Sequence, residues 1–198
     1  MALNKEPILK KCKALGISPM VMGVAKETKR DPKANVRKKE SEYARQLKEK
    51  QKLKFIYGVL EKQFRHIYEK AEKMEGQAGA NLLTLLELRL DNVAYRMGMA
   101  LTRREARQLV THRHFTVNGQ RVNIPSYRVK EGDVIALYEG SRSSQKFKDV
   151  LEQTANRPVP LWLEANKENF SVKVTRMPKV EDLDYEVEAH LIVELYSK

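Results

Sequence analysis

The chain has 198 residues and a formal net charge of +12, from 38 lysines and arginines against 26 aspartates and glutamates. With 41% hydrophobic residues it can bury a core, which excludes a chain disordered throughout. Its single cysteine, Cys12, excludes an internal disulfide and fits a reducing compartment, so we expect a cytoplasmic protein. We expect no membrane span, because no apolar run approaches the roughly 20 residues required.

The positive charge is concentrated in the N-terminal part of the chain. Residues 1–75 carry 20 basic and 10 acidic side chains, whereas residues 141–198 carry 9 and 10. Such a field favours an anionic partner, which is nucleic acid, an acidic membrane surface or, in third place, an acidic protein tail.

Residues 35–57 predict a long charged helix, which Gly58 interrupts, and a second helix follows to about Glu75. Local pairing with glutamates cannot neutralise all the cations of the first helix, which makes them candidates for RNA binding. A solvated charged helix explains the composition equally well. The candidate cations are Arg37, Lys38, Lys39, Arg45, Lys48, Lys50, Lys52 and Lys54.

A helical pattern runs from Leu82 to Gly98, with apolar side chains at steps of three and four residues on one face. Within it Asp91 ends an Arg-Leu-Asp triplet, which also occurs in pseudouridine synthases, where the aspartate is the nucleophile. The alternative is a surface charge or an ion pair with an arginine. We favour this structural role, because the remaining chain is too short for a large catalytic domain.

A further helix begins at Thr102 and Glu105, which form a capping box. We expect its arginines to project away from its apolar side, so that replacing them weakens RNA binding and leaves stability nearly unchanged. Arginine fits phosphate and stacks on unpaired bases, and residues 76–140 contain eight arginines and one lysine. The candidate RNA-binding residues of this region are Arg103, Arg104, Arg107, Gln108, His112, Arg113, His114, Arg121 and Arg128.

The next segments predict strands. Asn118-Gly119 lies between two short β-type runs and favours a type I′ hairpin. Residues 134–138 predict another strand. Beyond residue 140 we expect a helix near 145–153 and short strands at 170–174 and 191–195, where apolar and polar residues alternate.

The sequence predicts no enzyme, no cofactor and no metal site. The motifs GxxxxGK[ST], GxGxxG, GxSxG and HExxH are all missing from it. His112 and His114 flank Arg113, with no thiolate or carboxylate nearby in the sequence. These histidines are therefore interpreted as surface or RNA-facing groups and not as metal ligands.

Separated segments of the chain resemble one family. RLDNVAYRMG (89–98), TRREARQLV (102–110) and FTVNGQRVNIPSYRV (115–129) resemble the RNA-binding module named after small-subunit ribosomal protein four. The helical domain of that ribosomal protein is similar to residues 41–71, SEYARQLKEKQKLKFIYGVLEKQFRHIYEKA. Its C-terminal end is similar to residues 190–198, HLIVELYSK. The resemblance covers roughly residues 35–198.

The resemblance implies a structural component of the small ribosomal subunit. Such a protein binds small-subunit ribosomal RNA (rRNA) at a helix junction, nucleates assembly of the subunit body and contributes to decoding accuracy. It also implies ribosomal proteins five and three of the small subunit as neighbours. Messenger RNA is implied as a partner where it enters the subunit, close to Arg37, Lys38 and Lys39.

Two departures from the family accompany this resemblance. The family's N-terminal segment often carries four zinc-binding cysteines, whereas Cys12 stands alone here, so zinc is not expected. Arg113 stands where the family often has glycine, a position that suits a left-handed backbone. The alternatives are a zinc-free paralogue, an accessory RNA-binding factor and a pseudouridine synthase relative.

The expected fold is α+β, in two lobes. Residues 1–34 form a divergent extension and residues 35–81 a helical lobe. Residues 82–140 form an inserted RNA-binding module of helices and a short antiparallel sheet, and residues 141–198 pack on the helical lobe. Two rigid lobes that grip different RNA helices would bind only when those helices are correctly arranged.

Overall fold

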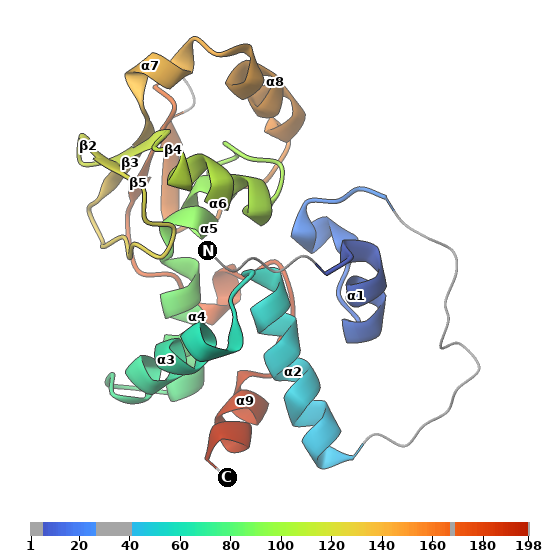
Figure 1. The fold of residues 1–198 in the computed structure, drawn as a ribbon. Coiled ribbons are helices and arrows are strands. Elements are labelled where there is room, and N and C mark those ends of the chain that lie inside the picture. Colours follow the sequence, from blue (N-terminus) through green and yellow to red (C-terminus); the bar gives the residue numbers. More distant parts are fainter. Residues whose placement is uncertain (1–5, 27–40, 167–168, 198) are drawn as a thin grey trace. The chain divides into compact units, whose positions relative to one another are not determined.

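The computed structural model describes residues 6–26, 41–166 and 169–197. The chain divides into two compact units, coloured along the sequence in Figure 1. Unit 1 comprises Met1–Leu82 and Asp184–Lys198, and unit 2 comprises Leu83–Leu183. The inserted unit therefore extends well beyond residue 140, where the sequence predicts that it ends.

Unit 1 is helical, as predicted for this lobe. Helices α2 and α9 pack against each other, and the Tyr196 ring of α9 stacks on Tyr68 of α3 with 4.6 Å between ring centroids. Burial of these faces holds together elements that lie far apart in the sequence. The elements of this unit are α1 (Ile8–Leu15), the 3-10 helix η1 (Pro19–Met22), α2 (Glu42–Ile56), α3 (Glu61–Glu72), the start of α4 (Ala78–Glu87) and α9 (Ala189–Tyr196).

The predicted interruption at Gly58 is confirmed. Helix α2 ends at Ile56, and Gly58 follows with a left-handed backbone, at a φ of 62°. The described part of the first helix is capped by Ser41, whose Oγ accepts the N–H of Ala44 at 3.3 Å. The predicted strand at 191–195 is wrong, because these residues belong to α9. Leu191 and Ile192 are adjacent in the sequence and both are buried in α9. In a strand, successive side chains point to opposite faces of the sheet, so a core on one face would bury only one of the two.

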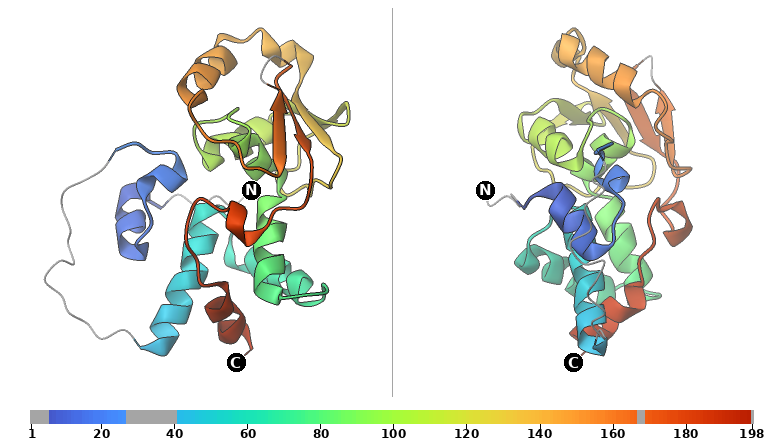
Figure 2. Two further views of the ribbon diagram at one scale, coloured as in Figure 1. Left: turned by 180° about the vertical axis from the view of Figure 1, so that it is seen from behind. Right: turned by 90° about the vertical axis from the view of Figure 1, so that its right-hand side faces the viewer.

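Unit 2 contains a five-stranded antiparallel sheet in the order β2-β1-β3-β5-β4. The registers place Phe115 opposite both Val122 and Leu137, and Ile135 opposite Val172. Figure 2 shows the orange β4–β5 hairpin of this sheet from behind. The strands are β1 (Phe115–Val117), β2 (Gln120–Val122), β3 (Val134–Leu137), β4 (Leu163–Asn166) and β5 (Ser171–Val174).

Strand pairing explains why the inserted unit is longer than predicted. Because β5 pairs with β3, residues 141–183 belong to unit 2 and not to the helical lobe, whereas residues 184–198, with α9, belong to unit 1 as predicted. The hydrophobic core of unit 2 includes Trp162 and Phe147 from this later part, both nearly fully buried. The helical elements of the unit are α5 (Leu90–Arg96), α6 (Arg103–Thr111), α7 (Glu139–Arg142), α8 (Gln145–Thr154) and the 3-10 helix η2 (Val180–Asp182).

The predicted single helix over residues 82–98 is two helices, α4 and α5, separated at Leu88 and Arg89. Val129 donates its backbone N–H to the carbonyl of Leu88 at 3.0 Å, and Leu90 donates to the carbonyl of Tyr127 at 2.9 Å. These bonds to a distant segment replace intrahelical bonds and make Arg89 extended, with a ψ of 136°. Asp91 thus lies in the first turn of a new helix.

Candidate nucleic-acid interface

Helix α6 begins as the sequence predicts, at Thr102. The Thr102 Oγ1 accepts the backbone N–H of Glu105 at 3.2 Å. The Glu105 carboxylate accepts the N–H of Leu101 at 2.9 Å, one residue before the position that a standard capping box would use. This cap fixes where the helix starts and therefore which face its arginines occupy.

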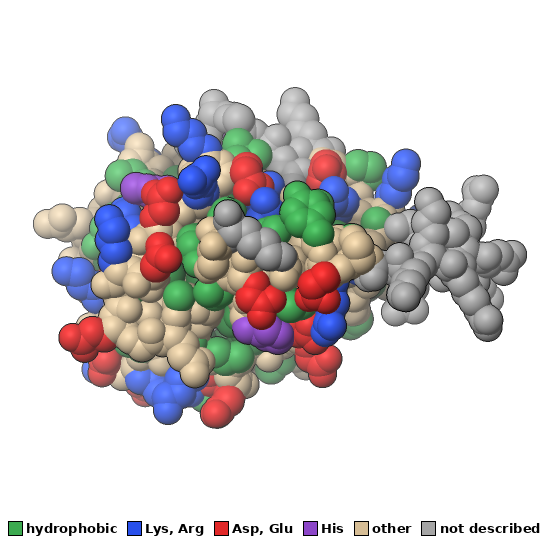
Figure 3. Space-filling model, turned by 90° about the horizontal axis from the view of Figure 1, so that it is seen from below, with side chains coloured by type: hydrophobic (Ala, Val, Ile, Leu, Met, Phe, Trp, Pro, Cys, Tyr) green, Lys and Arg blue, Asp and Glu red, His purple; other side chains and the backbone are tan. Residues whose placement is uncertain are grey.

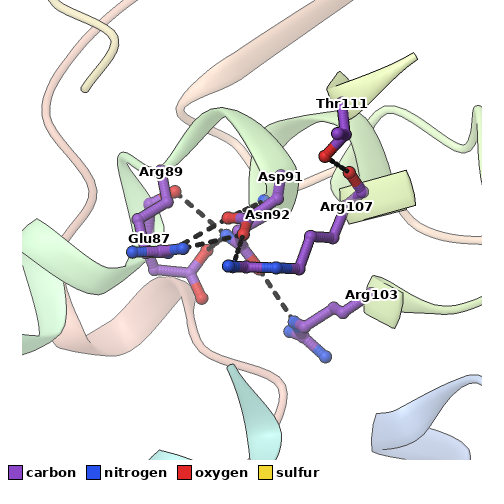
Figure 4. A network of polar contacts seen from close by, with 7 residues as sticks. All are labelled: Glu87, Arg89, Asp91, Asn92, Arg103, Arg107 and Thr111. Atoms are coloured by element: carbon purple, nitrogen blue, oxygen red, sulfur yellow. Dashed lines mark hydrogen bonds and ion pairs between the residues drawn. The ribbon is translucent and has the colours of Figure 1, made fainter. Parts of the chain in front are cut away.

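A buried carboxylate joins α5 to α6. Asp91 is 4% exposed, and its oxygens accept hydrogen bonds from Nε and Nη2 of Arg89 at 3.1 and 2.8 Å. Nη1 of Arg107 donates to the same group at 3.2 Å, as Figure 4 shows. The backbone N–H of Asn92 also donates to it at 3.0 Å. The charge of Asp91 is therefore satisfied inside the fold, where loss of one partner would be strongly destabilising.

A second buried carboxylate, that of Glu87, extends this network. It accepts Nη2 of Arg96 at 3.0 Å and the side-chain amide of Asn92 at 2.9 Å. The amide oxygen of Asn92 in turn accepts Nε of Arg103 at 2.9 Å. The guanidinium of Arg103 also lies 4.4 Å from the ring centroid of Tyr95. Side chains from α4, α5 and α6 are thus linked by directional bonds, which fixes their relative positions.

The expectation that Arg103 and Arg107 project outward is wrong. Arg103 is only 6% exposed, and both side chains point from α6 toward the start of α5 (Figure 4). The sequence did contain the signal, because Arg103 stands three and seven residues before Ala106 and Val110, which places all three on one helical face. The buried guanidinium is held by the Asn92 oxygen, which accepts its Nε–H, and by the face of the Tyr95 ring.

The outward candidates lie at the other end of α6. Gln108, His112 and Arg113 are exposed, whereas Arg104 is half-buried. Arg113 follows the helix with a φ of 64°, so it adopts the left-handed conformation expected where the resembled family often has glycine. Its side chain leaves the end of the helix toward solvent, and the strained backbone carries a cation at this corner.

The predicted hairpin is confirmed, with φ of 50° at Asn118 and 81° at Gly119 between β1 and β2. It places Arg121 on the outer strand of the sheet, exposed to solvent. Nε and Nη2 of Arg121 both donate to the carbonyl of Arg113 at 3.2 Å, and its guanidinium lies 4.0 Å from the Tyr138 ring centroid. The hairpin and the end of α6 therefore form one corner.

His114 is half-buried beneath this corner. Its Nδ1 lies 2.9 Å from the Ser141 Oγ, and its ring meets that of Phe147 edge-on. Burial lowers the pKa of His114, and nearby His112, Lys146 and Arg121 lower it further. Burial, and after it the cationic neighbours, thus favour the neutral imidazole.

Arg128 is half-buried beside Arg89, with which it forms an isolated antiparallel bridge. Burial lowers the pKa of Arg128, and repulsion from Arg89 lowers it further. Arg89 is itself paired with Asp91, so this repulsion is partly compensated inside the fold.

The cations of α2 are held by acidic groups within unit 1. Arg45 donates from Nη2 to both Glu188 oxygens, at 3.0 and 2.7 Å, and Lys52 pairs with Glu49. Lys48 is half-buried. On the face seen in Figure 3, acidic and basic side chains lie side by side. Sequence reasoning counted only local glutamates and missed acceptors from other elements.

Glu61, in the first turn of α3, is the centre of another ion cluster. It accepts hydrogen bonds from Lys50 and Lys54 of α2 and from the Tyr196 hydroxyl of α9. Burial opposes its ionisation, but the bonds from the two lysines outweigh this effect and lower its pKa to about 2. The cluster links α2, α3 and α9.

Three predicted RNA-binding residues, Arg37, Lys38 and Lys39, lie outside the described residues.

The alternative role of Asp91 as a nucleophile does not fit its surroundings, because the carboxylate is buried and bonded to two arginines. In the described ranges 6–26, 41–166 and 169–197, no group of three or more His, Cys, Asp or Glu residues could hold a metal ion. Over the same ranges, no helix has both the length and the apolar character needed to span a membrane.

Comparison with known families defines the class of protein. The S4 domain family matches residues 88–135, which contain α5, α6 and the first strands of the sheet. The family described as "Ribosomal protein S4/S9 N-terminal domain" matches residues 4–87, most of unit 1. The chain is therefore a ribosomal-type protein in which an S4 domain is joined to a helical domain.

Individual relatives give the particular family. The chain is 54% identical over 198 residues to "Small ribosomal subunit protein uS4" of Lachnospira eligens, with all of both chains covered. It is 62% identical over 162 residues to the protein of that name from Clostridioides difficile, covering 82% of this chain and 78% of the relative. The chain belongs to the uS4 family of small ribosomal subunit proteins. This family is structural and not enzymatic.

Proposed function

This chain is a structural protein of the small ribosomal subunit and binds rRNA in the cytoplasmic ribosome. We propose that it binds a junction of rRNA helices directly and nucleates assembly of the subunit body. The observation that carries the proposal is the exposed cationic corner of unit 2, where Arg113 and Arg121 lie on a framework fixed by buried ion pairs. A rigid display of guanidiniums suits a folded polyanion, because little ordering is required on binding.

Geometry is the basis of selection in this proposal. Duplex RNA hides its base edges in a deep major groove, so recognition depends on phosphates, 2′-hydroxyls and the shape of the junction. The two units grip different RNA helices, and binding is strongest when those helices are correctly arranged. Protein binding and RNA folding thereby promote each other, which is the physical content of nucleating assembly.

The resemblance to the family further supports neighbouring positions for ribosomal proteins five and three, and a contribution to decoding accuracy. It also supports contact with messenger RNA where that RNA enters the subunit, through Arg37, Lys38 and Lys39.

Incorporation into ribosomes tests the main proposal: tagged protein should occur at one copy per purified small subunit. Absence from those particles would favour the accessory-factor alternative.

Salt dependence tests the RNA contacts directly. If about 6 to 10 phosphates are neutralised, affinity for the isolated rRNA domain should fall by roughly 10³ to 10⁵ between 50 and 200 mM salt. Arg113→Gln should weaken binding and reduce the slope by about one unit, as expected for a lost phosphate contact. Gln153→Ala, at an exposed neutral residue of α8 that is not among the RNA-binding candidates, is the control and should leave the slope unchanged. A nearly flat salt dependence contradicts the proposal.

A further inference from the structure

Arg121 is held in one orientation although it is exposed. Its guanidinium lies over the Tyr138 ring, and two of its nitrogens donate to a single oxygen, the carbonyl of Arg113. An exposed arginine normally samples many rotamers, so a ring on one side and a paired hydrogen bond at one edge restrict it strongly. Arg121 is nevertheless exposed to solvent, so the ring and the carbonyl do not enclose it.

Backbone features of the same corner maintain this arrangement. Tyr138 donates its N–H to the carbonyl of His114 at 2.8 Å, which anchors the residue beneath Arg121. A Cβ at Gly140 would lie 2.8 Å from Cε1 of Tyr138, so only glycine leaves the ring in this place. The left-handed backbone of Arg113 supplies the carbonyl that Arg121 uses. The stack therefore depends on three segments that meet at this corner.

The surroundings of the stack favour an anion. Lys146 is paired with Glu105 at 3.2 Å, so this lysine is balanced by an acidic group. Arg113 and Arg121 are both exposed, and Arg121 uses a neutral carbonyl as its acceptor and not a carboxylate. His112 is exposed on the same turn as Arg113. The corner thus combines a flat cationic surface with positive charge beside it.

We propose that Arg121 and Tyr138 form a subsite for one unpaired RNA nucleotide. The base stacks on the side of the Arg121 guanidinium that faces away from Tyr138, and the attached phosphate lies beside Arg113. Guanidinium planes and aromatic rings are the surfaces on which proteins stack single-stranded bases. This inference rests on the proposed RNA binding and adds recognition of an unpaired base, which a helix junction offers beside its duplex arms.

The test compares two fluorescein-labelled probes at low salt, oligoadenylate and an abasic ribose-phosphate oligomer of the same length. The full chain should bind oligoadenylate about fivefold or more tightly, since stacking contributes at least that factor per base. Arg121→Lys keeps the charge but removes the planar surface, so it should abolish this preference while affinity for the abasic oligomer is retained. Gln120→Ala, on the same strand and also exposed, is the matched control and should keep the preference.

A second variant, Tyr138→Leu, removes the ring beneath the guanidinium and should also reduce the preference. Urea unfolding followed by tryptophan fluorescence establishes that each variant is folded. Equal binding of both probes by the unaltered chain, or a preference that survives in folded Arg121→Lys, overturns the subsite but leaves RNA binding intact. Failure to bind either probe, together with failure to bind rRNA, overturns the proposed function as well.

Discussion

Arg103→Gln distinguishes a structural arginine from an RNA-binding one. The Arg103 side chain is 6% exposed and donates Nε–H to the amide oxygen of Asn92, itself 1% exposed. Its guanidinium also lies over the Tyr95 ring. Glutamine is shorter and uncharged, so it loses the ring contact and leaves the Asn92 oxygen without this donor. We expect the variant to destabilise unit 2.

The magnitude follows from these contacts. A hydrogen bond from a charged donor contributes about 1.5 to 3 kcal/mol. The cation–π contact adds about 0.5 to 2 kcal/mol, and release of a buried charge offsets part of the sum. We expect a net loss of about 2 to 4 kcal/mol in the free energy of unfolding. With a denaturant slope of about 1.5 kcal/mol/M, the urea midpoint falls by roughly 1.3 to 2.7 M.

The chain provides its own reporter for this assay. Trp162 is its single tryptophan, is fully buried and lies in the core of unit 2. Its fluorescence during urea unfolding therefore follows the unit that contains Arg103. The matched control is Arg113→Gln, the same chemical change at an exposed position, which should alter the free energy of unfolding by less than about 0.5 kcal/mol.

A structural role for Arg103 is contradicted if Arg103→Gln leaves the urea midpoint of Trp162 fluorescence unchanged and weakens RNA binding instead. That result would mean that the guanidinium faces solvent in the folded protein. The opposite pattern, lost stability with RNA affinity preserved when the variant is measured well below its midpoint, is the expected one. Arg113→Gln should show the reverse pair of effects.

The remaining predictions concern other parts of the fold. Glu61 has a folded pKa of about 2 against an ordinary value of 4.5, so its stabilising contribution is complete above pH 4.5 and is lost as the pH falls toward 2. Glu61→Gln should lower the stability at neutral pH and remove this component from an acid titration of helicity by far-UV circular dichroism. Leu90→Ala should cost about 2 to 5 kcal/mol in urea unfolding, because Leu90 is fully buried. Arg113→Gly should raise the unfolding free energy by about 0.5 to 1 kcal/mol through relief of its positive φ, and should weaken RNA binding in a filter assay.

Local signals in the sequence predicted the parts of the fold that depend on neighbouring residues. The cap at Thr102, the turn at Asn118-Gly119 and the boundary at Gly58 each arise from chemistry within a few residues. The break before α5 could not be found in this way, because it results from backbone bonds to residues some forty positions later. The C-terminal helix could not be recognised from its own residues either, because its apolar residues also fit the alternation of a strand.

Charge, periodicity and turn residues are properties of the chain, and they are enough to predict a basic protein with arginine-rich helices and a small sheet. Which arginines are available to RNA depends instead on how the helices pack. A guanidinium is stable either in water or beside buried acceptors, and the acceptors of Arg103 and Arg107 come from α5. Whether a cation faces outward thus depends on what packs against it, which the positions along one helix do not specify.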